Sequence, residues 1–402
     1  MADALKPRND TEVIEAVRWA IAEEKTLEVL GRGTKRMVGR AAQTDLTLDV
    51  SALSGVTLYE PEELVLSAEA GTPIAEIEKL LAKSNQELAF EPVDLGPLLG
   101  GKAGEGSLGG VVASNLSGPR RIKAGAVRDH ALGVAAVSGR GEAFKAGGRV
   151  VKNVTGYDLP RFLTGSWGTL AVATSWTLKV LPAAEDVATL VVPGLDAGRA
   201  GEAMRAAMNT AADVSGAAHF PAKVAARLGG PSFAGKSVTA LRLEGVPPSI
   251  AYRRDKLAEM LKPFGAPATL GAAESRTFWQ AVRDAKPFAD GSARVVWRIS
   301  VPPTLGAATG TALAVLGADI FYDWAGGLIW AEMQDDRPRE VEVRAALDGQ
   351  GHALLVRASV AARASTASFE PLEPGVAALV KRLKESFDPR GILNPGRMYA
   401  GM

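Results

Sequence analysis

The chain has 402 residues and no cysteine. Without thiols it cannot form disulfides, use a cysteine nucleophile, or hold zinc or an iron–sulfur cluster through sulfur ligands. Histidine is nearly as scarce, with only His130, His219 and His352. Because none of the three is paired at metal-ligand spacing, we predict no metal site in this chain.

A surplus of charge of one sign is also missing. The 46 basic and 45 acidic residues leave a net charge of +1, whereas a nucleic-acid-binding protein needs a basic surplus that neutralises phosphates. No stretch reaches the ~18 apolar residues of a membrane span, and residues 1–10 lack the apolar core of a signal peptide. The sequence therefore predicts a soluble, cytoplasmic protein without a nucleic-acid partner.

The residues that are present have an ordinary globular composition, with 47 % hydrophobic and 23 % charged residues. The length suits two domains. In the first half, periodicity predicts a helix over 10–24 with Asp10 or Thr11 as N-cap, and a second helix over 73–83 opened by Thr72. Short apolar runs predict strands over 26–30, 46–50 and 63–70, so this half is predicted to be mixed α/β.

Two glycine-rich segments occur in this half. Gly31-Arg32-Gly33-Thr34-Lys35 directly follows the predicted strand 26–30, so its backbone N–H groups can approach an anion closely. Residues 91–118 begin with a rigid turn and then contain six glycines between positions 100 and 110. A chain keeps so much glycine where its backbone lies against a ligand, and a flexible surface loop is the alternative for the second segment.

Two nucleotide-binding patterns occur in the wrong context. Residues 104–109 fit G-x-G-x-x-G, but loop residues precede them where the dinucleotide motif needs a strand. Residues 230–237 fit the Walker A pattern, which joins a strand to a helix. Here a predicted helix over 222–228 precedes the pattern and a predicted strand over 237–243 follows it. We therefore predict neither a Rossmann site nor ATP binding.

The strongest pattern is a series of six motifs in a fixed order along the chain. They are SLGG at 107–110, GPRR at 118–121, GAVRD at 125–129, KNVTGYD at 152–158, KVLP at 179–182 and FDPRGILNPGR at 387–397. With these motifs the sequence resembles the FAD-binding domain of the vanillyl-alcohol oxidase type, also called the PCMH fold. Within that group it resembles most the FAD-binding subunit of bacterial glycolate oxidases. One such motif is weak, but six in sequence are highly specific.

The resemblance implies which residues hold FAD. Residues 31–35 would form the pyrophosphate loop, with Lys35 facing the phosphates. The rest of the cofactor site would be lined or supported by Pro92, Asp94, Ser107, Gly109, Gly110, Ser114, Asn115, Gly118, Gly125, Arg128, Asp129, Gly168, Thr169 and Val172. For Arg128 and Asp129, a structural ion pair is the alternative. The FAD would be non-covalent, because the chain has no cysteine and residues 31–40 contain no histidine.

The second half is predicted to be an α+β cap domain, a ferredoxin-like sandwich with helices on one face of a sheet. The predicted strands are 187–192, 237–243, 294–301, 320–324, 328–333 and 353–358. The predicted helices are 201–212, 250–261, 275–285 and 339–347, with a last one over 372–386. The predicted domains are a PCMH-type FAD-binding domain over 1–182, the cap over 183–370, and a C-terminal helix and tail over 371–402 that returns to the FAD domain.

Oxidation of a 2-hydroxy acid needs a cation for the carboxylate and a base for the hydroxyl proton. Arg298, near Tyr322, Trp324 and Trp330 in the cap, is the candidate cation, and a paired structural arginine in an aromatic core is the alternative. His130 is the candidate base, and a packing residue is the alternative. The resemblance implies a histidine pair and a carboxylate around a metal in catalytic relatives, which this chain lacks.

Three functions stay open. In the first, the chain is an FAD-binding subunit of a glycolate (2-hydroxy acid) oxidase or dehydrogenase complex. The resemblance then implies a second, catalytic flavoprotein, an iron–sulfur subunit and a small 2-hydroxy acid as partners, and leaves open peripheral contact with the inner face of the cell membrane through the complex. In the second, it is a stand-alone FAD-dependent oxidase of another small alcohol or acid. In the third, it is a non-catalytic assembly subunit with structural FAD.

Overall fold

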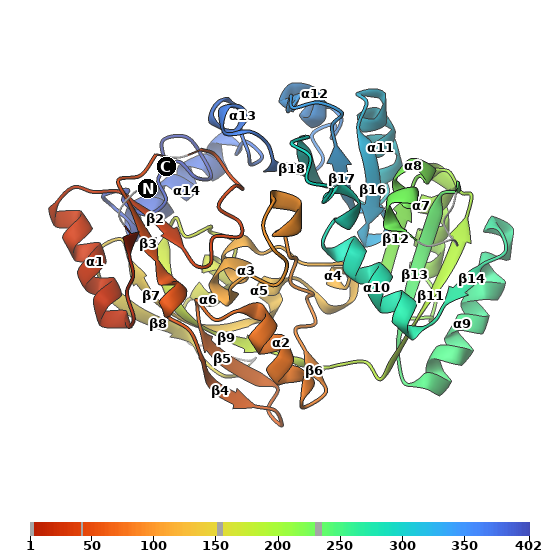
Figure 1. The fold of residues 1–402 in the computed structure, drawn as a ribbon, viewed down its shortest axis with the longest axis horizontal. Helices are drawn as coiled ribbons and strands as arrows, with labels where there is room; N and C mark the ends of the chain where they lie inside the picture. Colours follow the sequence, from red (N-terminus) through yellow and green to blue (C-terminus); the bar gives the residue numbers. More distant parts are fainter. Residues whose placement is uncertain (1–3, 42, 151–155, 230–234) are drawn as a thin grey trace.

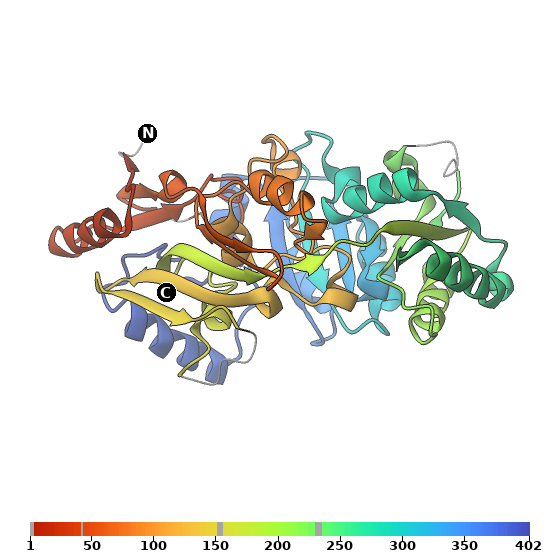
Figure 2. The ribbon, with the colours of Figure 1, turned by 90° about the horizontal axis from the view of Figure 1, so that it is seen from below.

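The computed structural model describes residues 4–41, 43–150, 156–229 and 235–402, which form two lobes side by side (Figure 1). The first lobe contains the N-terminal half of the chain, and the second lobe contains an eight-stranded sheet with its helices. The chain then returns, so that helix α14 (Pro374–Phe387) lies along the first lobe (Figure 2). Along the described segments, no helix combines the length and apolar character needed to cross a membrane.

A small parallel sheet forms one wall of the first lobe. Its strand order is β1 (Ala4–Leu5), β3 (Leu46–Asp49) and β2 (Leu27–Leu30). Helix α1 (Asp10–Ala22) packs Val13 and Val17 against this sheet in one hydrophobic cluster. The N-cap of α1 is Asn9, whose extended backbone lets its side chain accept the amide of Glu12. The prediction of Asp10 or Thr11 as the cap is therefore wrong by one or two residues.

A five-stranded antiparallel sheet forms the opposite wall of the first lobe. Its strand order is β4 (Val56–Glu60), β5 (Val65–Glu69), β9 (Ala171–Lys179), β7 (Ala131–Ser138) and β8 (Ala143–Gly147). Helix α2 (Ile74–Ala82) buries Ile77 and Leu81 against it. Thr72 does not cap α2, because its hydroxyl donates to the carbonyl of Glu69 and Pro73 holds the cap position. The short strands β6 (Gln86–Glu87) and β10 (Leu181–Pro182) pair beside the boundary between the lobes.

Four short helices lie between the strands of the first lobe: α3 (Leu108–Ser114), α4 (Arg121–Ala124), α5 (Val127–His130) and α6 (Leu159–Leu163). Helix α3 begins after Ser107, so a helix does follow the G-x-G-x-x-G pattern. The residues before it form a 3-10 turn over Pro97–Leu99 and a loop. Because no strand leads into α3, the dinucleotide motif still lacks half of its structural context.

Two sequence patterns fall partly outside the described residues. Residues 152–155 of the KNVTGYD motif and residues 230–234 of the Walker A pattern are among those not described. Around the Walker A pattern, helix α8 (Ala222–Ala225) comes first and strand β13 (Val238–Gly245) comes after. This order is the reverse of a P-loop, which agrees with our exclusion of ATP binding.

The second lobe is built on one antiparallel sheet of eight strands. Their order is β14 (Ala268–Leu270), β11 (Asp186–Pro193), β13, β12 (Gly216–Phe220), β16 (Asp319–Asp323), β17 (Leu328–Glu332), β15 (Val296–Ser300) and β18 (His352–Arg357). One face packs against α7 (Ala197–Met208), α9 (Pro247–Leu261), α11 (Gly306–Val315) and α12 (Glu340–Ala345). This arrangement matches the predicted α+β sandwich.

The other face of the cap sheet is turned to the first lobe. Phe220, Phe321 and Trp330 alternate with the residues of the first face and pack with Leu95 of the first lobe. Helix α10 (Ala272–Arg283) also lies here and adds Phe278 to the same cluster. The prediction that all helices lie on one face is therefore wrong for α10. It fills the part of this face that the first lobe leaves uncovered.

The C-terminal segment is bound to the first lobe by buried polar contacts. After α13 (Val360–Ser365) and α14, Leu393 forms a parallel bridge with Leu27. Asn394 accepts the amide of Val29 at 2.8 Å and donates from Nδ2 to the carbonyl of Trp167 at 2.8 Å. The ammonium of Lys384 donates to the carbonyl of Thr169 at 2.6 Å. Lys384 and the FDPRGILNPGR motif thus join strand β2 to the segment that precedes β9.

Candidate functional site

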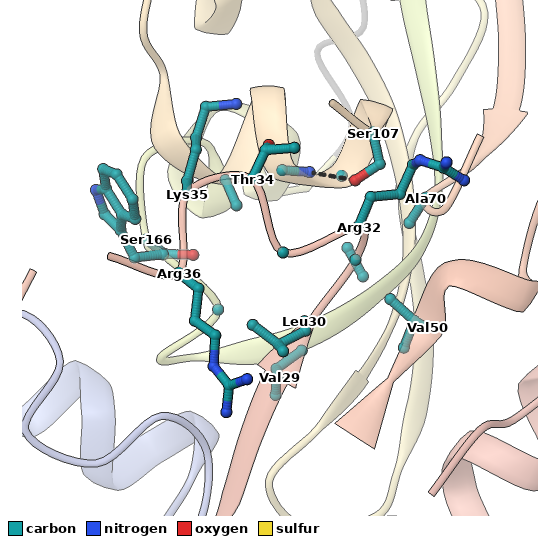
Figure 3. Close-up of a pocket in the computed structure, with 18 of the residues that line it drawn as sticks. Val29, Leu30, Arg32, Thr34, Lys35, Arg36, Val50, Ala70, Ser107 and Ser166 are labelled. Atoms are coloured by element: carbon teal, nitrogen blue, oxygen red, sulfur yellow. Dashed lines mark hydrogen bonds between the residues drawn. The ribbon is translucent and has the colours of Figure 1, made fainter. Parts of the chain in front are cut away.

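A cavity lies between the two sheets of the first lobe (Figure 3). Its walls come from the end of β2, the loop after it, Ala70 directly after β5, helix α3 and strand β9. The lining residues include Leu30, Gly31, Arg32, Gly33, Thr34, Lys35, Ala70, Ser107, Gly109, Gly110, Trp167, Gly168 and Arg397. Distant segments of the sequence therefore meet at one site.

The loop over residues 31–35 offers free backbone donors to this cavity. Among the described residues, the amides of Arg32, Gly33 and Thr34 donate no hydrogen bond. Gly33 has a φ of +73° and no neighbour within 4 Å of an added Cβ, whereas an added Cβ at Gly31 would collide with Oγ of Ser107. Successive free amides beside small residues form a concave anion-binding surface. The first amides of α3, in contrast, are already bonded to Thr72, Ala70 and Ser107.

Lys35 adds a buried positive charge to the loop. Its side chain is buried, and it points away from Arg36 in the close-up (Figure 3). Burial lowers the pKa of Lys35 to about 8, and the negative charge of Asp94 opposes this shift. A phosphate group would place a negative charge beside this ammonium and favour its charged form. The loop and Lys35 therefore fit the pyrophosphate of a dinucleotide.

The cavity contains only some of the residues that we predicted to bind the cofactor. Those that line it are Gly31, Arg32, Gly33, Thr34, Lys35, Ser107, Gly109, Gly110 and Gly168. Those that do not are Pro92, Asp94, Ser114, Asn115, Gly118, Gly125, Arg128, Asp129, Thr169 and Val172. The second set surrounds the site or supports it, and any direct contact of these residues with FAD stays a prediction.

Several residues of the second set have structural partners. Asp94 accepts the amides of Gly96 and Gly104, which closes the turn before α3. Asn115 ends α3 with a left-handed backbone and accepts the amide of Arg128 at 3.2 Å. Asp129 accepts the amide of Ala126 at 2.8 Å rather than pairing with Arg128. The alternative of an Arg128–Asp129 ion pair is therefore wrong in the described structure.

The other members of this set lie in the packing around the cavity. Pro92 bridges to Ser117, and the hydroxyl of Ser114 donates to Val111 within α3. The hydroxyl of Thr169 donates to the carbonyl of Ser166 at 2.7 Å. Val172 is fully buried in the cluster around α1 and β2. The side chain of Val172 therefore faces that hydrophobic cluster rather than the cavity.

Trp167 and Arg397 are two of the cavity residues that the sequence analysis missed. Trp167 has a φ of +54°, and its ring lies 5.5 Å from the guanidinium carbon of Arg397. Arg397 donates from Nη2 to the carbonyl of Lys35 at 2.9 Å. The sequence analysis included Arg397 only as the last residue of the FDPRGILNPGR motif and gave it no role. Its position beside the pyrophosphate loop depends on the return of the tail, which the local pattern does not predict.

A second constellation lies where the cap sheet meets the first lobe. The guanidinium carbons of Arg298 and Arg121 each lie 4.8 Å from the centre of the Trp324 ring. Arg298 is 8 % exposed, and its Nε and Nη2 atoms have no hydrogen-bond partner among the described residues. Burial, together with the charge of Arg121, lowers the pKa of Arg298 to about 9, while Asp323 opposes the shift. The alternative of a paired structural arginine is therefore wrong, although the tryptophans do belong to the cap core.

Asp323 is a carboxyl group of this constellation that the sequence analysis missed. It ends β16, is 1 % exposed, and accepts the amide of Trp324 at 2.7 Å. Burial raises the pKa of Asp323 to about 7, with Glu91 adding to the shift and Arg242 and Arg298 opposing it. A carboxyl group with this pKa can exchange a proton near neutral pH.

The contacts of His130 favour the packing interpretation. The ring is fully buried, with Nε2 2.9 Å from the carbonyl of Ala124 and Nδ1 3.3 Å from the carbonyl of Lys179. Its centre lies 5.2 Å from that of Phe90. Burial lowers the pKa of His130, so the ring is neutral at pH 7. In the described part of the chain, no group of three His, Cys, Asp or Glu residues could hold a metal ion.

The comparisons agree with this geometry. The family described as FAD binding domain matches residues 3–147. The solved structure of p-cresol methylhydroxylase with bound substrate gives a TM-score of 0.70 at 13 % identity, over 99 % of this chain and 88 % of that chain. Cavity, fold and family match together define a flavoprotein with a PCMH-type FAD-binding domain. The cofactor of the first lobe is FAD.

Two sequence relatives narrow the class. The glycolate oxidase subunit GlcE of Escherichia coli K12 is 32 % identical over 397 residues, which cover 96 % of this chain and 97 % of GlcE. The glycolate oxidase subunit GlcD of Bacillus subtilis strain 168 is 27 % identical over 226 residues, which cover 55 % of this chain and 44 % of GlcD. This chain belongs to the GlcE family of glycolate oxidase subunits.

Proposed function

We propose that the chain is the FAD-binding subunit of a multi-subunit glycolate oxidase or dehydrogenase. The observation that carries the proposal is the likeness to GlcE over nearly the full length of both chains. The loop over residues 31–35, which lines the cavity of the first lobe and fits a pyrophosphate, agrees with it. FAD, when bound, accepts the electrons that leave the 2-hydroxy acid. Residues 31–35 hold its pyrophosphate, and the described residues of this loop contain no group that forms a covalent flavin link.

The proposed partners are a second, catalytic flavoprotein and an iron–sulfur subunit. The printed names of two relatives both describe subunits of a glycolate oxidase, which supports an assembly of more than one chain. An iron–sulfur cluster needs cysteine ligands, and this chain has none, so another subunit must supply them. Contact with the inner face of the cell membrane, if the complex makes it, occurs through those partners. We also propose the domain limits 1–182, 183–370 and 371–402.

The test is anaerobic reduction of the bound flavin by glycolate. The complex is purified from its native host through a tag on this chain, and the isolated chain is prepared in parallel. We expect a second flavoprotein and an iron–sulfur protein to co-purify with the tagged chain. We also expect glycolate to reduce the flavins of the complex, seen as loss of their absorbance, at least as fast as the complex turns over. Loss of both partners under gentle conditions contradicts the proposal.

A second candidate function is oxidation of the 2-hydroxy acid by this chain itself. The observation that favours it is the buried Arg298, whose Nε and Nη2 atoms lack partners while Asp323 lies on the same sheet face. Arg298 would bind the substrate carboxylate through a two-point contact. Asp323 would take the hydroxyl proton, and Trp324 and Trp330 would exclude water. Rapid bleaching of the isolated chain by glycolate supports this candidate over the first.

A further inference from the structure

A second cavity lies on the other face of the parallel sheet from the FAD cavity. Along β2, Val29 lines the FAD cavity, whereas Glu28 lines the second one, as the alternation of a strand requires. The remaining walls come from the segment after residue 35, from α13 and from the C-terminal tail. The cavity has a volume of about 640 Å³, which is in the usual range for small-molecule sites.

Arginine dominates the charge of this cavity. Arg36, Arg40, Arg363 and Arg397 line it, against two carboxylates, Glu28 and Asp45. Both carboxylates are engaged: Glu28 accepts from Nε of Arg36 at 2.9 Å, and Asp45 accepts the amide and hydroxyl of Thr26 and pairs with Lys25. Among the described residues, Arg40, Arg363 and Arg397 form no ion pair. In the described structure these three guanidinium groups therefore have no carboxylate at ion-pair distance, although the charge of Glu28 acts on Arg397.

Two of these three arginines are almost fully buried. Arg363 is 5 % exposed and Arg397 is 8 % exposed, and the Nε atom of each has no partner in the described structure. In the described structure the side chain of Arg363 donates to the carbonyl of Gly39 and to Sδ of Met37, and the side chain of Arg397 donates to the carbonyl of Lys35. Burial lowers the pKa of both; in Arg397 the negative charge of Glu28 opposes the shift, and the charges of Arg363 and Arg36 add to it. Buried cations of like charge are costly unless an anion lies between them.

We propose that this cavity, the arginine pocket of Arg40, Arg363 and Arg397, binds a small molecule that carries two negative charges on oxygen atoms. The chemistry is that of a dicarboxylate or a phosphate ester, because the Nε edge of a guanidinium binds either group with two parallel hydrogen bonds. The pocket adjoins the FAD cavity, and Arg36 and Arg397 line both. Arg397 reaches both sites, since its Nη2 atom donates to the carbonyl of Lys35 in the pyrophosphate loop.

The test is isothermal titration calorimetry on the FAD-loaded chain, with succinate and inorganic phosphate as probes and chloride at matched ionic strength as reference. We expect saturable one-to-one binding of at least one probe. The substitutions Arg40→Ala and Arg363→Gln each remove charged hydrogen bonds and weaken binding by roughly tenfold or more. Arg382→Ala, which changes an exposed arginine on α14, leaves binding unchanged. The flavin absorbance, followed in parallel, shows that FAD stays bound.

The choice of probe distinguishes the two ligand classes. Binding of succinate alone assigns a dicarboxylate, and binding of phosphate alone assigns a phosphate ester. Heat no larger than that of chloride for both probes overturns the proposal, as does binding that survives both substitutions. Arg40 is half-buried and its side chain makes no hydrogen bond in the described structure, so Arg40→Ala keeps the test valid if Arg363→Gln fails to fold.

Discussion

The indole Nε1 of Trp324 donates a hydrogen bond of 3.0 Å to the carbonyl of Gly118, across the boundary between the two lobes. Gly118 opens the GPRR motif of the first lobe, and Trp324 follows the last residue of strand β16 in the cap. Trp324 also lies between the aromatic core of the cap and Arg121 of the first lobe. The ring of Trp324 is therefore one of the contacts that hold the cap against the FAD domain, together with ion pairs such as Arg120–Glu244 and Arg242–Glu91.

Trp324→Phe tests that link. The substitution keeps an aromatic ring but removes the indole donor; the carbonyl of Gly118 still accepts the amide of Arg121 at 3.1 Å, so the loss costs about 0.5–1.5 kcal/mol. We expect the melting temperature to fall by several degrees. The control is Trp19→Phe on α1, where the side chain is 44 % exposed. Equal melting temperatures for the two variants would show that the interdomain bond contributes nothing measurable.

Lys35→Met tests the pyrophosphate loop. Loss of a charged hydrogen bond to phosphate costs about 1.5–3 kcal/mol, so we expect the Kd for FAD to rise by roughly 10- to 100-fold. Reconstitution of the apo chain, followed by flavin fluorescence, measures this change. Lys79→Met on the exposed side of α2 is the matched control. An unchanged Kd in Lys35→Met places the phosphates elsewhere.

The same lysine predicts how FAD affinity depends on pH. The pKa of Lys35 in the empty chain is lowered to about 8, chiefly by burial, and bound phosphate raises it again. Above pH 8 the apo chain must take up a proton in order to bind, so affinity falls as pH rises from 8 to 9. The wild-type chain shows this fall in a fluorescence titration, and Lys35→Met does not. A fall of the same size in both chains excludes Lys35 as its source.

Arg298→Gln tests the second candidate function. If Arg298 binds the substrate carboxylate, its loss raises the KM for glycolate by roughly 100-fold, and Arg298→Lys recovers part of the loss. Anaerobic stopped-flow reduction of the flavin measures both values. FAD content stays equal to that of the control Arg276→Gln, an exposed arginine on α10. A KM within twofold of the wild-type value in Arg298→Gln excludes this role.

Asp323→Asn tests the proton acceptor and has a second, independent readout. The pKa of Asp323 is raised from 3.8 to about 7, mainly by burial. The folded chain therefore binds a proton that the unfolded chain has lost, and stability falls as pH rises from 4 to 7, by at most about 4 kcal/mol. Asparagine keeps the acceptor for the Trp324 amide but cannot ionise. In urea unfolding, the free energy of unfolding of the variant should thus rise relative to that of the wild type, by an amount that grows from pH 5 to pH 8.

The kinetic readout of the same variant concerns the base itself. Flavin reduction by glycolate in the wild type is expected to rise with pH through about 7, as the carboxyl group of Asp323 loses its proton. In Asp323→Asn the rate is lower and this rise disappears. A variant that keeps the wild-type rate and pH profile shows that another group accepts the proton.

Local patterns predicted the parts of the site that depend on few residues. Loop 31–35 follows an apolar strand directly, so its place at the end of β2 could be predicted from the sequence. Helix α3 was hidden, because the glycines at 109 and 110 have low helix propensity and indicate a loop. Helix α11 was missed for the same reason, since Gly306 and Gly310 lie within it. In both helices tertiary packing outweighs the intrinsic preference.

Long-range contacts explain what the sequence could not predict. Arg397 reaches the FAD loop only because Asn394 bonds to Val29 and Trp167, which are distant in the chain. The role of Asp323 depends on its burial between the two lobes, and no motif indicates burial. The sequence pattern also does not indicate which face of each cap strand packs against the first lobe, because both faces of the eight-stranded sheet are buried. Val172 was predicted as a cofactor residue on the basis of the family resemblance, yet its side chain packs in the core.

The most direct test of the central claim is the absorbance spectrum of the pure chain, before and after acid precipitation. We predict a flavin spectrum with about one FAD per chain, and release of all flavin into the supernatant, because the described loop residues offer no covalent link. Glycolate is added to a second sample to record reduction. A colourless chain that FAD cannot reconstitute contradicts the claim that the first lobe holds FAD, and flavin retained in the precipitate contradicts its non-covalent binding.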